Sequence, residues 1–68
     1  MDFISAIQKV MEGQRVFRDD WVSSPNTYVS MKSDILSIKN EDGKFHGWMI
    51  SKADMDADDW HVWVNSLD

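Results

Sequence analysis

The sequence has no cysteine, a single proline and only two arginines. The lack of cysteine excludes disulfides, thiolate metal sites and a thiol nucleophile, and it suits a reducing compartment. Twelve acidic residues outnumber seven basic ones, which gives a formal net charge of −5 at pH 7. Because binding to the backbone of DNA or RNA depends on clustered Lys and Arg, this composition argues against a nucleic-acid polymer as the partner.

Long apolar runs and a basic N-terminal region are also missing. A membrane-spanning helix needs about 18 consecutive apolar residues or more, so we expect no association with a membrane. A secretory signal peptide begins with a positively charged region, whereas this chain begins Met1-Asp2-Phe3. We therefore expect a soluble protein without a targeting segment.

The length of 68 residues leaves room for a single domain, residues 1–68. A domain of this size buries only about 60% of the surface that its unfolded chain exposes. Its own core then supplies only a few kcal/mol of stability, and no disulfide adds to it. The small size therefore favours association of several copies.

Residues 2–12 are predicted to form an amphipathic helix. Apolar residues recur there at the spacing of one buried helical face, at Phe3, Ala6, Ile7 and Val10. Asp2 is suited to cap the first turn because its carboxylate can accept free backbone N–H groups. Gly13 follows the segment, where a helix end favours a residue in the left-handed conformation. Both ends of the helix are therefore marked.

The rest of the chain carries five short runs rich in β-branched and aromatic residues, at 15–18, 27–31, 35–39, 45–50 and 60–64. The pair Asp42-Gly43 predicts a hairpin between two of these runs, and Pro25-Asn26 predicts a turn. Residues 51–59 are interpreted as a connector with a helical turn. Together these elements predict an α+β domain, in which the N-terminal helix packs on a small antiparallel sheet of about five strands.

One acidic segment imitates the start of a calcium-binding loop. Asp54, Asp56 and Asp58 alternate as the first ligands of such a loop do. The sixth position is Asp59 where the loop needs glycine, and the twelfth is Asn65 where it needs glutamate. We therefore interpret the segment as a solvated acidic turn whose first carboxylates cap a helical turn.

The side chains needed for catalysis do not come together in the sequence. His46 and His61 are the only imidazoles, and neither shares a helical face with its nearest aspartate. In the predicted strand, His46 shares a face with Trp48, and we expect it at the surface or at a rim. No serine lies in a nucleophile-elbow context, and three dispersed glycines form no phosphate-binding loop. We predict a protein that is not an enzyme and that uses no cofactor and no metal ion.

Four tryptophans in so short a chain are the remaining candidates for function. Trp63 lies between two valines and is predicted to belong to the core. Trp21 follows Arg18 and precedes a polar loop. An indole beside a guanidinium suits a planar anionic ligand such as a nucleotide, because the ring stacks on a base and the fork of donors binds phosphate. Packing in the core, or at an interface between copies, accounts for Trp21 equally well.

Two blocks of residues in a fixed order resemble a known family. The first block is Phe3, Ala6, Val10, Gly13, Val16, Arg18 and Trp21; Tyr28-Val29 and Asp42-Gly43 follow, and the second block is Trp48, Ser51, Asp54, Ala57, Asp59 and Trp60. This order resembles the Thoeris anti-defence two-like family of small phage and prophage proteins. The resemblance covers nearly the whole chain, from Phe3 to about Val62.

The resemblance implies a protein that acts as a sponge. Members of that family bind cyclic nucleotide second messengers of bacterial immunity, of the cyclic ADP-ribose type or cyclic oligonucleotides, and hold them without cleavage. They assemble as homo-oligomers with ligand pockets where protomers meet. The implied location is the cytoplasm of the infected bacterial host.

The candidate ligand-binding residues that follow from the resemblance are Arg18, Trp21, Asn26, Tyr28, Asp59 and Trp60. Trp21 is assigned to stacking on a base, and Arg18 to a phosphate or ribose. Asp59 is assigned to ribose hydroxyls or a base amino group, while Trp60 matches the second block and equally suits the core. Asn26 and Tyr28 are included because of their place in and after the predicted loop.

An alternative function uses the acidic character of the chain directly. The segment 54–59 concentrates four aspartates, Asp54, Asp56, Asp58 and Asp59. Such a surface can dock in a basic groove of another protein and mimic nucleic acid there. The alternative prediction is therefore an inhibitor that binds a host or phage protein and no small molecule.

Overall fold

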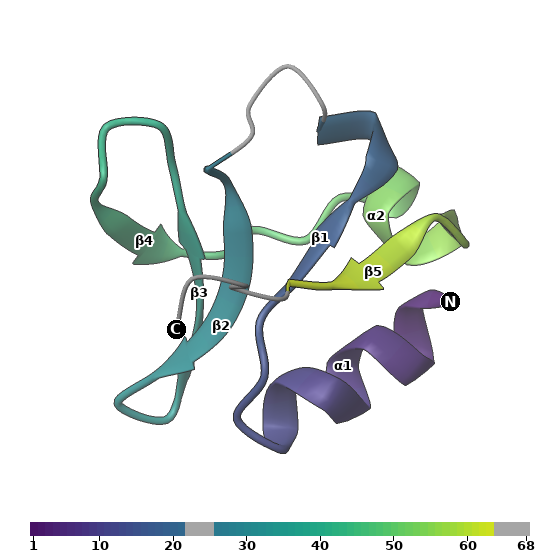
Figure 1. The fold of residues 1–68 in the computed structure, drawn as a ribbon, viewed down its shortest axis with the longest axis horizontal. Coiled ribbons are helices and arrows are strands. Elements are labelled where there is room, and N and C mark those ends of the chain that lie inside the picture. Colours follow the sequence, from purple (N-terminus) through teal and green to yellow (C-terminus); the bar gives the residue numbers. More distant parts are fainter. Residues whose placement is uncertain (22–25, 64–68) are drawn as a thin grey trace.

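A five-stranded antiparallel sheet with a helix on one face forms the body of the protein (Figure 1). The computed structural model describes residues 1–21 and 26–63. Its elements are α1 (Phe3–Met11), β1 (Val16–Arg18), the 3-10 helix η1 (Asp19–Trp21), β2 (Tyr28–Lys32), β3 (Ile35–Lys39), β4 (Phe45–Gly47), α2 (Lys52–Asp56) and β5 (Trp60–Val62). The strand order is β4-β3-β2-β1-β5. The predicted α+β fold is confirmed.

Helix α1 begins and ends where the sequence predicts. The Asp2 carboxylate accepts a hydrogen bond from the backbone N–H of Ser5 at 2.9 Å, and Gly13 has a φ of +94° just after the helix. The buried face of α1 presents Ala6 and Val10 to the sheet. The helix packs against β1, β2 and β5 and leaves the β3–β4 half of that face uncovered.

Two hairpins connect the central strands. Asp42-Gly43 lies in the connection between β3 and β4, as predicted, and Gly43 takes a φ of +79° there. The connection from β2 to β3 is a two-residue turn in which Ser33 and Asp34 both have positive φ, at 51° and 65°. Such a turn matches the right-handed twist of paired strands. Strand β4 is shorter than the predicted run 45–50 because its pairing with β3 ends at Gly47.

Alternation along the strands divides the side chains between two faces. Val16 and Val29 are paired across β1 and β2, and both are buried under α1 together with Trp60 of β5. Trp63 follows β5 with the opposite parity, so it lies on the other face, half-buried, with its ring centroid 5.2 Å from that of Tyr28. We predicted Trp63 in the core, but the structure places it with Phe17 and Tyr28 and outside the buried cluster around Trp60.

The predicted helical turn in the connector is the short helix α2. Ser51 and Asp54 form a reciprocal capping box at its start, each side chain accepting from the other's backbone N–H. Within the described residues, no helix has the length and apolar character to cross a membrane. The turn predicted at Pro25 and the end of the last predicted strand at Val64 lie outside the described residues.

Candidate functional site

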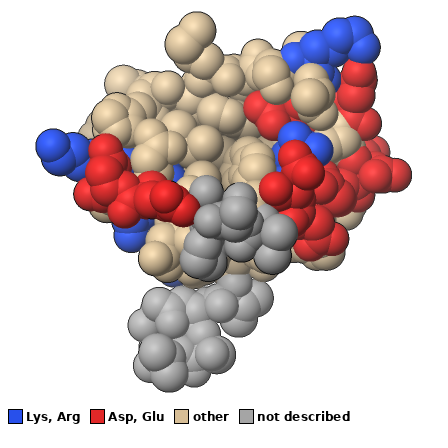
Figure 2. Space-filling view, turned by 90° about the horizontal axis from the view of Figure 1, so that it is seen from above, with Lys and Arg blue, Asp and Glu red and all other residues tan. Residues whose placement is uncertain are grey.

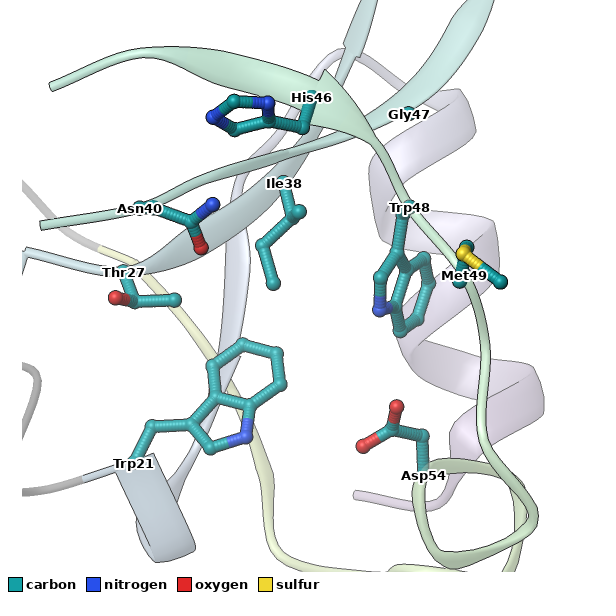
Figure 3. A pocket seen from close by; sticks show the side chains of 9 residues that line it. All are labelled: Trp21, Thr27, Ile38, Asn40, His46, Gly47, Trp48, Met49 and Asp54. Atoms are coloured by element: carbon teal, nitrogen blue, oxygen red, sulfur yellow. The ribbon is translucent and has the colours of Figure 1, made fainter. Parts of the chain in front are cut away.

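A cavity of about 460 Å³ opens on the half of the sheet that α1 leaves uncovered (Figure 3). Its lining residues come from η1, β3, β4 and the segments around α2 and before β2: Trp21, Thr27, Ile38, Asn40, His46, Gly47, Trp48, Met49 and Asp54. The cavity therefore gathers residues from distant parts of the chain. Its volume lies in the range of small-molecule sites, which is roughly 300–1,000 Å³.

Three tryptophans build the aromatic part of the site. Trp60 lies behind the cavity, only 1% exposed, and its indole N–H donates to the backbone carbonyl of Asp54 at 3.2 Å. Trp21 and Trp48 pack edge-on against it, with ring centroids 5.4 and 5.7 Å from that of Trp60. Trp21 and Trp48 line the cavity and are half-buried. The site thus presents two indoles that are held in place by a third.

The Asp54 carboxylate points into the space between the Trp21 and Trp48 indoles (Figure 3). The residue is only 8% exposed. Its Oδ1 accepts from Nη1 of Arg18 at 3.1 Å, and its Oδ2 accepts from the backbone N–H of Ser51 at 3.3 Å. A buried carboxylate needs such donors, because the protein interior replaces the water that would solvate it.

Arg18 holds a second carboxylate as well. Its Nε donates to Oδ1 of Asp59 at 3.0 Å, and Oδ2 of Asp59 accepts from the backbone N–H of Asp20 at 3.1 Å. The hydrogen bond to Asp59 and the weaker effect of Asp54 raise the pKa of Arg18. Burial raises the pKa of Asp59, but the hydrogen bonds from Arg18 and Asp20 outweigh it, so that pKa lies below its usual value. The network fixes η1, which carries Trp21, against the segment that carries Asp54.

The rest of the lining mixes polar and apolar side chains, and no Lys or Arg is among the lining residues that the structure describes. Thr27 and Asn40 supply neutral donors and acceptors. His46 lies exposed at the cavity, with its Nε2 3.6 Å from Oδ2 of Asp42, so its predicted place at the surface or at a rim is confirmed. Met49 is 91% exposed, which leaves one side of the cavity open to solvent.

The six residues predicted from the sequence lie in four places. Trp21 lines the cavity, whereas Arg18, Asp59 and Trp60 lie behind it and support the residues that do. Tyr28 is buried on the opposite face of the sheet, where the Arg15 guanidinium carbon lies 5.3 Å and the Lys39 Nζ 5.5 Å from its ring centroid. The remaining residue, Asn26, is exposed and does not line the cavity.

Sequence reasoning missed that Asp54 lines the cavity. We expected a solvated turn, but this side chain is buried, and only its capping of α2 follows the prediction. The available signal was the Ser51-x-x-Asp54 capping box ahead of a short helix. The place of Trp48 was also indicated by the sequence, because alternation along the strand puts it on the same face as His46.

The resemblance of this segment to a calcium loop has no counterpart in the structure. Asp54 is paired with Arg18, and Asp56 is paired with Nζ of Lys52 at 2.6 Å on the exposed side of α2. In the described ranges 1–21 and 26–63, no group of three potential ligands is placed to hold a metal ion. Asp54 and Asp56 therefore serve two separate ion pairs.

Comparison with known proteins places the chain in a family. The chain matches the family model of the Thoeris anti-defense 2-like domain over residues 1–63. It is 26% identical over 84 aligned positions to the protein named Thoeris anti-defense 2 from Bacillus phage SP01, an alignment that covers 91% of this chain and 93% of that protein. The resemblance seen in the sequence is thereby confirmed, and the chain belongs to the Thoeris anti-defense 2-like family.

Proposed function

We propose that this protein sequesters a cyclic nucleotide immune signal, of the cyclic ADP-ribose type or a cyclic oligonucleotide, without cleaving it. Membership of the family gives the general role, which is phage anti-defence. The observation that carries the proposal is the pair of indoles, Trp21 and Trp48, that line one cavity. The proposed place of action is the cytoplasm of the infected bacterial host.

The chemistry of the cavity suits a nucleoside group. A base has two flat faces, and stacking on an aromatic side chain contributes about 1–3 kcal/mol per base. Trp21 and Trp48 offer such surfaces, and Trp60 holds both rings in place from behind. Asn40, Thr27 and Asp54 add the few polar groups that orient a ligand in an apolar site.

The placement of the histidines supports binding without turnover. His46 and His61 are each paired with an aspartate, Asp42 and Asp19 respectively. Both imidazoles are exposed, and among the described side chains neither forms a hydrogen bond to a serine or threonine hydroxyl. A nucleophile and its base would need that contact. The proposal therefore assigns storage of the ligand to the site, and no bond cleavage.

An assembly of identical copies would complete the site. Small-molecule sites usually bury about 70–90% of the ligand surface, whereas this cavity is open on the side of Met49. Apolar side chains are exposed along the same segment: Met49 at 91%, Ile50 at 37% and Met55 at 50%. We propose that a second copy covers this segment and closes the cavity.

Calorimetric titration with cyclic dinucleotides and cyclic ADP-ribose isomers tests the proposal. We expect at least one member of the panel to bind. Trp21→Ala and Trp48→Ala should each weaken binding about tenfold or more, the effect of losing one stacking surface. Trp63→Ala is the matched control, because Trp63 lies on the opposite face of the sheet and should leave affinity unchanged. If calorimetry detects no binding for any member of the panel, the proposal is refuted.

The second candidate function, an acidic inhibitor of another protein, is supported by the surface. Figure 2 shows acidic side chains gathered in groups on one face of the molecule. Asp54 and Asp59 turn inward to Arg18, so the docking surface would consist of exposed residues such as Asp20 and Asp58. This candidate predicts a protein complex that weakens with salt and when these two aspartates are changed to Asn.

A further inference from the structure

We propose that Asp54 selects the base that enters the cavity, by accepting hydrogen bonds from its exocyclic amino group. The inference rests on the proposed function and makes it more specific, since it names the chemical feature of the ligand that the site recognises. A base with an amino group at its edge is preferred over the same base with hydrogen or oxygen at that position.

The first support is that the Asp54 carboxylate has unused hydrogen-bond acceptor positions. A carboxylate offers about four acceptor positions on its two oxygens. Arg18 fills one on Oδ1 and the Ser51 backbone N–H fills one on Oδ2. The carboxylate points into the cavity between the two indoles (Figure 3), so positions that these donors leave unfilled face the ligand.

The charge of the lining is the second support. Asp54 carries the negative charge of the cavity wall, and no Lys or Arg is among the described residues that line it. The one guanidinium behind it is shared with Asp59, so the three groups together carry a net negative charge. This surrounding favours an N–H donor and disfavours a phosphate or a carbonyl oxygen at the same place. The heterocycle, and no phosphate, is therefore the part of the ligand that meets Asp54.

The orientation of the carboxylate is the third support. The backbone of Asp54 is anchored by the indole N–H of Trp60, and its side chain is anchored by Arg18 and by Ser51. A buried acceptor fixed in this way loses little freedom when a ligand binds, and it costs free energy to leave unmatched. Discrimination of this kind is strong, because the wrong ligand leaves a desolvated polar group without a partner.

Three cyclic dinucleotides test the selection: cyclic di-AMP and cyclic di-GMP carry exocyclic amino groups, and cyclic di-IMP lacks them. The wild-type protein should bind at least one amino-bearing ligand about tenfold more tightly than cyclic di-IMP. Asp54→Asn keeps the size of the side chain and can still accept from Ser51, but it adds an amide N–H donor. This variant should lose the preference or reverse it in favour of cyclic di-IMP.

Asp56→Asn is the matched control. Asp56 lies on the exposed side of the same helix, pairs with Lys52 and does not line the cavity, so this variant should keep the wild-type order of affinities. Thermal melting of each variant confirms that it is folded. Equal binding of the three ligands by the wild type, or an unchanged order in Asp54→Asn, overturns the role of Asp54 and leaves the proposed sequestration intact. Binding of no cyclic nucleotide in the panel overturns both.

Discussion

Arg18 and Asp54 lie 36 positions apart in the chain and meet at 3.1 Å between Nη1 and Oδ1. This contact connects the end of β1 to α2. It therefore links η1, which follows β1 and carries Trp21, to Asp54 in the wall of the cavity. Arg18 was expected to contact a ligand directly, and the structure shows its donors engaged by two carboxylates. We propose that it acts as a positioning residue, which orients the Asp54 carboxylate.

Removal of Arg18 should destabilise the fold more than removal of an exposed cation. Arg18→Met leaves Asp54 with a buried charge and no counterion. We expect a loss of roughly 2–3 kcal/mol in the free energy of unfolding, somewhat below the cost for a fully buried pair. Lys52→Met, which breaks the exposed pair with Asp56, should cost about 0.5 kcal/mol or less. Urea denaturation measures both, and equal losses would contradict the structural role of Arg18.

The stability of the fold should fall in acid through Asp59. Its pKa is lowered in the folded state, so between the folded and unfolded values the unfolded chain binds more protons. The stabilisation that ionised Asp59 provides is present at neutral pH. It is lost as the pH falls below about 4 and through the pKa of Asp59 in the folded state. Arg18 has a raised pKa and stays protonated throughout this range.

Unfolding experiments between pH 2 and pH 6 check this dependence. Asp59→Asn should flatten the dependence of stability on pH at the acidic end. An identical slope in the variant and the wild type would show that Asp59 does not contribute to it.

Gly13 should be sensitive to substitution, and Gly47 should not. A Cβ on either residue would meet no atom within 4 Å, so space is equal at both positions. Gly13 has a φ of +94°, in the left-handed region that a side chain disfavours. Gly13→Ala should cost about 1 kcal/mol, whereas Gly47→Ala should be close to neutral for stability. Thermal melting distinguishes the two, and equal melting temperatures would exclude a conformational cost at Gly13.

Association of copies should depend on the segment beside the cavity. Met49→Glu places a charge on a residue that is 91% exposed, and it should lower the mass measured by light scattering. Met11→Glu is the control, because Met11 is also exposed, at 72%, but lies at the end of α1. A wild-type protein that is monomeric at all concentrations, or equal effects of the two changes, would reject the proposed interface.

Local signals account for the parts of the fold that the sequence predicts well. The Asp2 cap, the spacing from Phe3 to Val10 and Gly13 act within a few residues, and α1 forms between them. The Asp42-Gly43 hairpin is local in the same way. The turn at Ser33 and Asp34 was not predicted, because neither residue is the glycine or asparagine that usually marks positive φ.

The site was predicted less well because it depends on contacts between distant residues. The burial of Asp54 requires Arg18, and nothing in the acidic spacing of 54–59 indicates a partner on β1. Tyr28 and Trp63 lie on the same face of the sheet, and only the docking of α1 on the other face decides which face is the core. Trp21 and Trp48 line the same cavity because both pack against Trp60, a relationship that no local pattern contains.

Recovery of the bound signal after denaturation distinguishes storage of the ligand from its cleavage. The protein is loaded with the cyclic nucleotide that binds best, washed free of excess ligand and then heated. We predict release of the intact cyclic nucleotide, in constant ratio to protein and independent of incubation time. A linear or fragmented product that accumulates with time would contradict the account, as would the absence of any retained nucleotide.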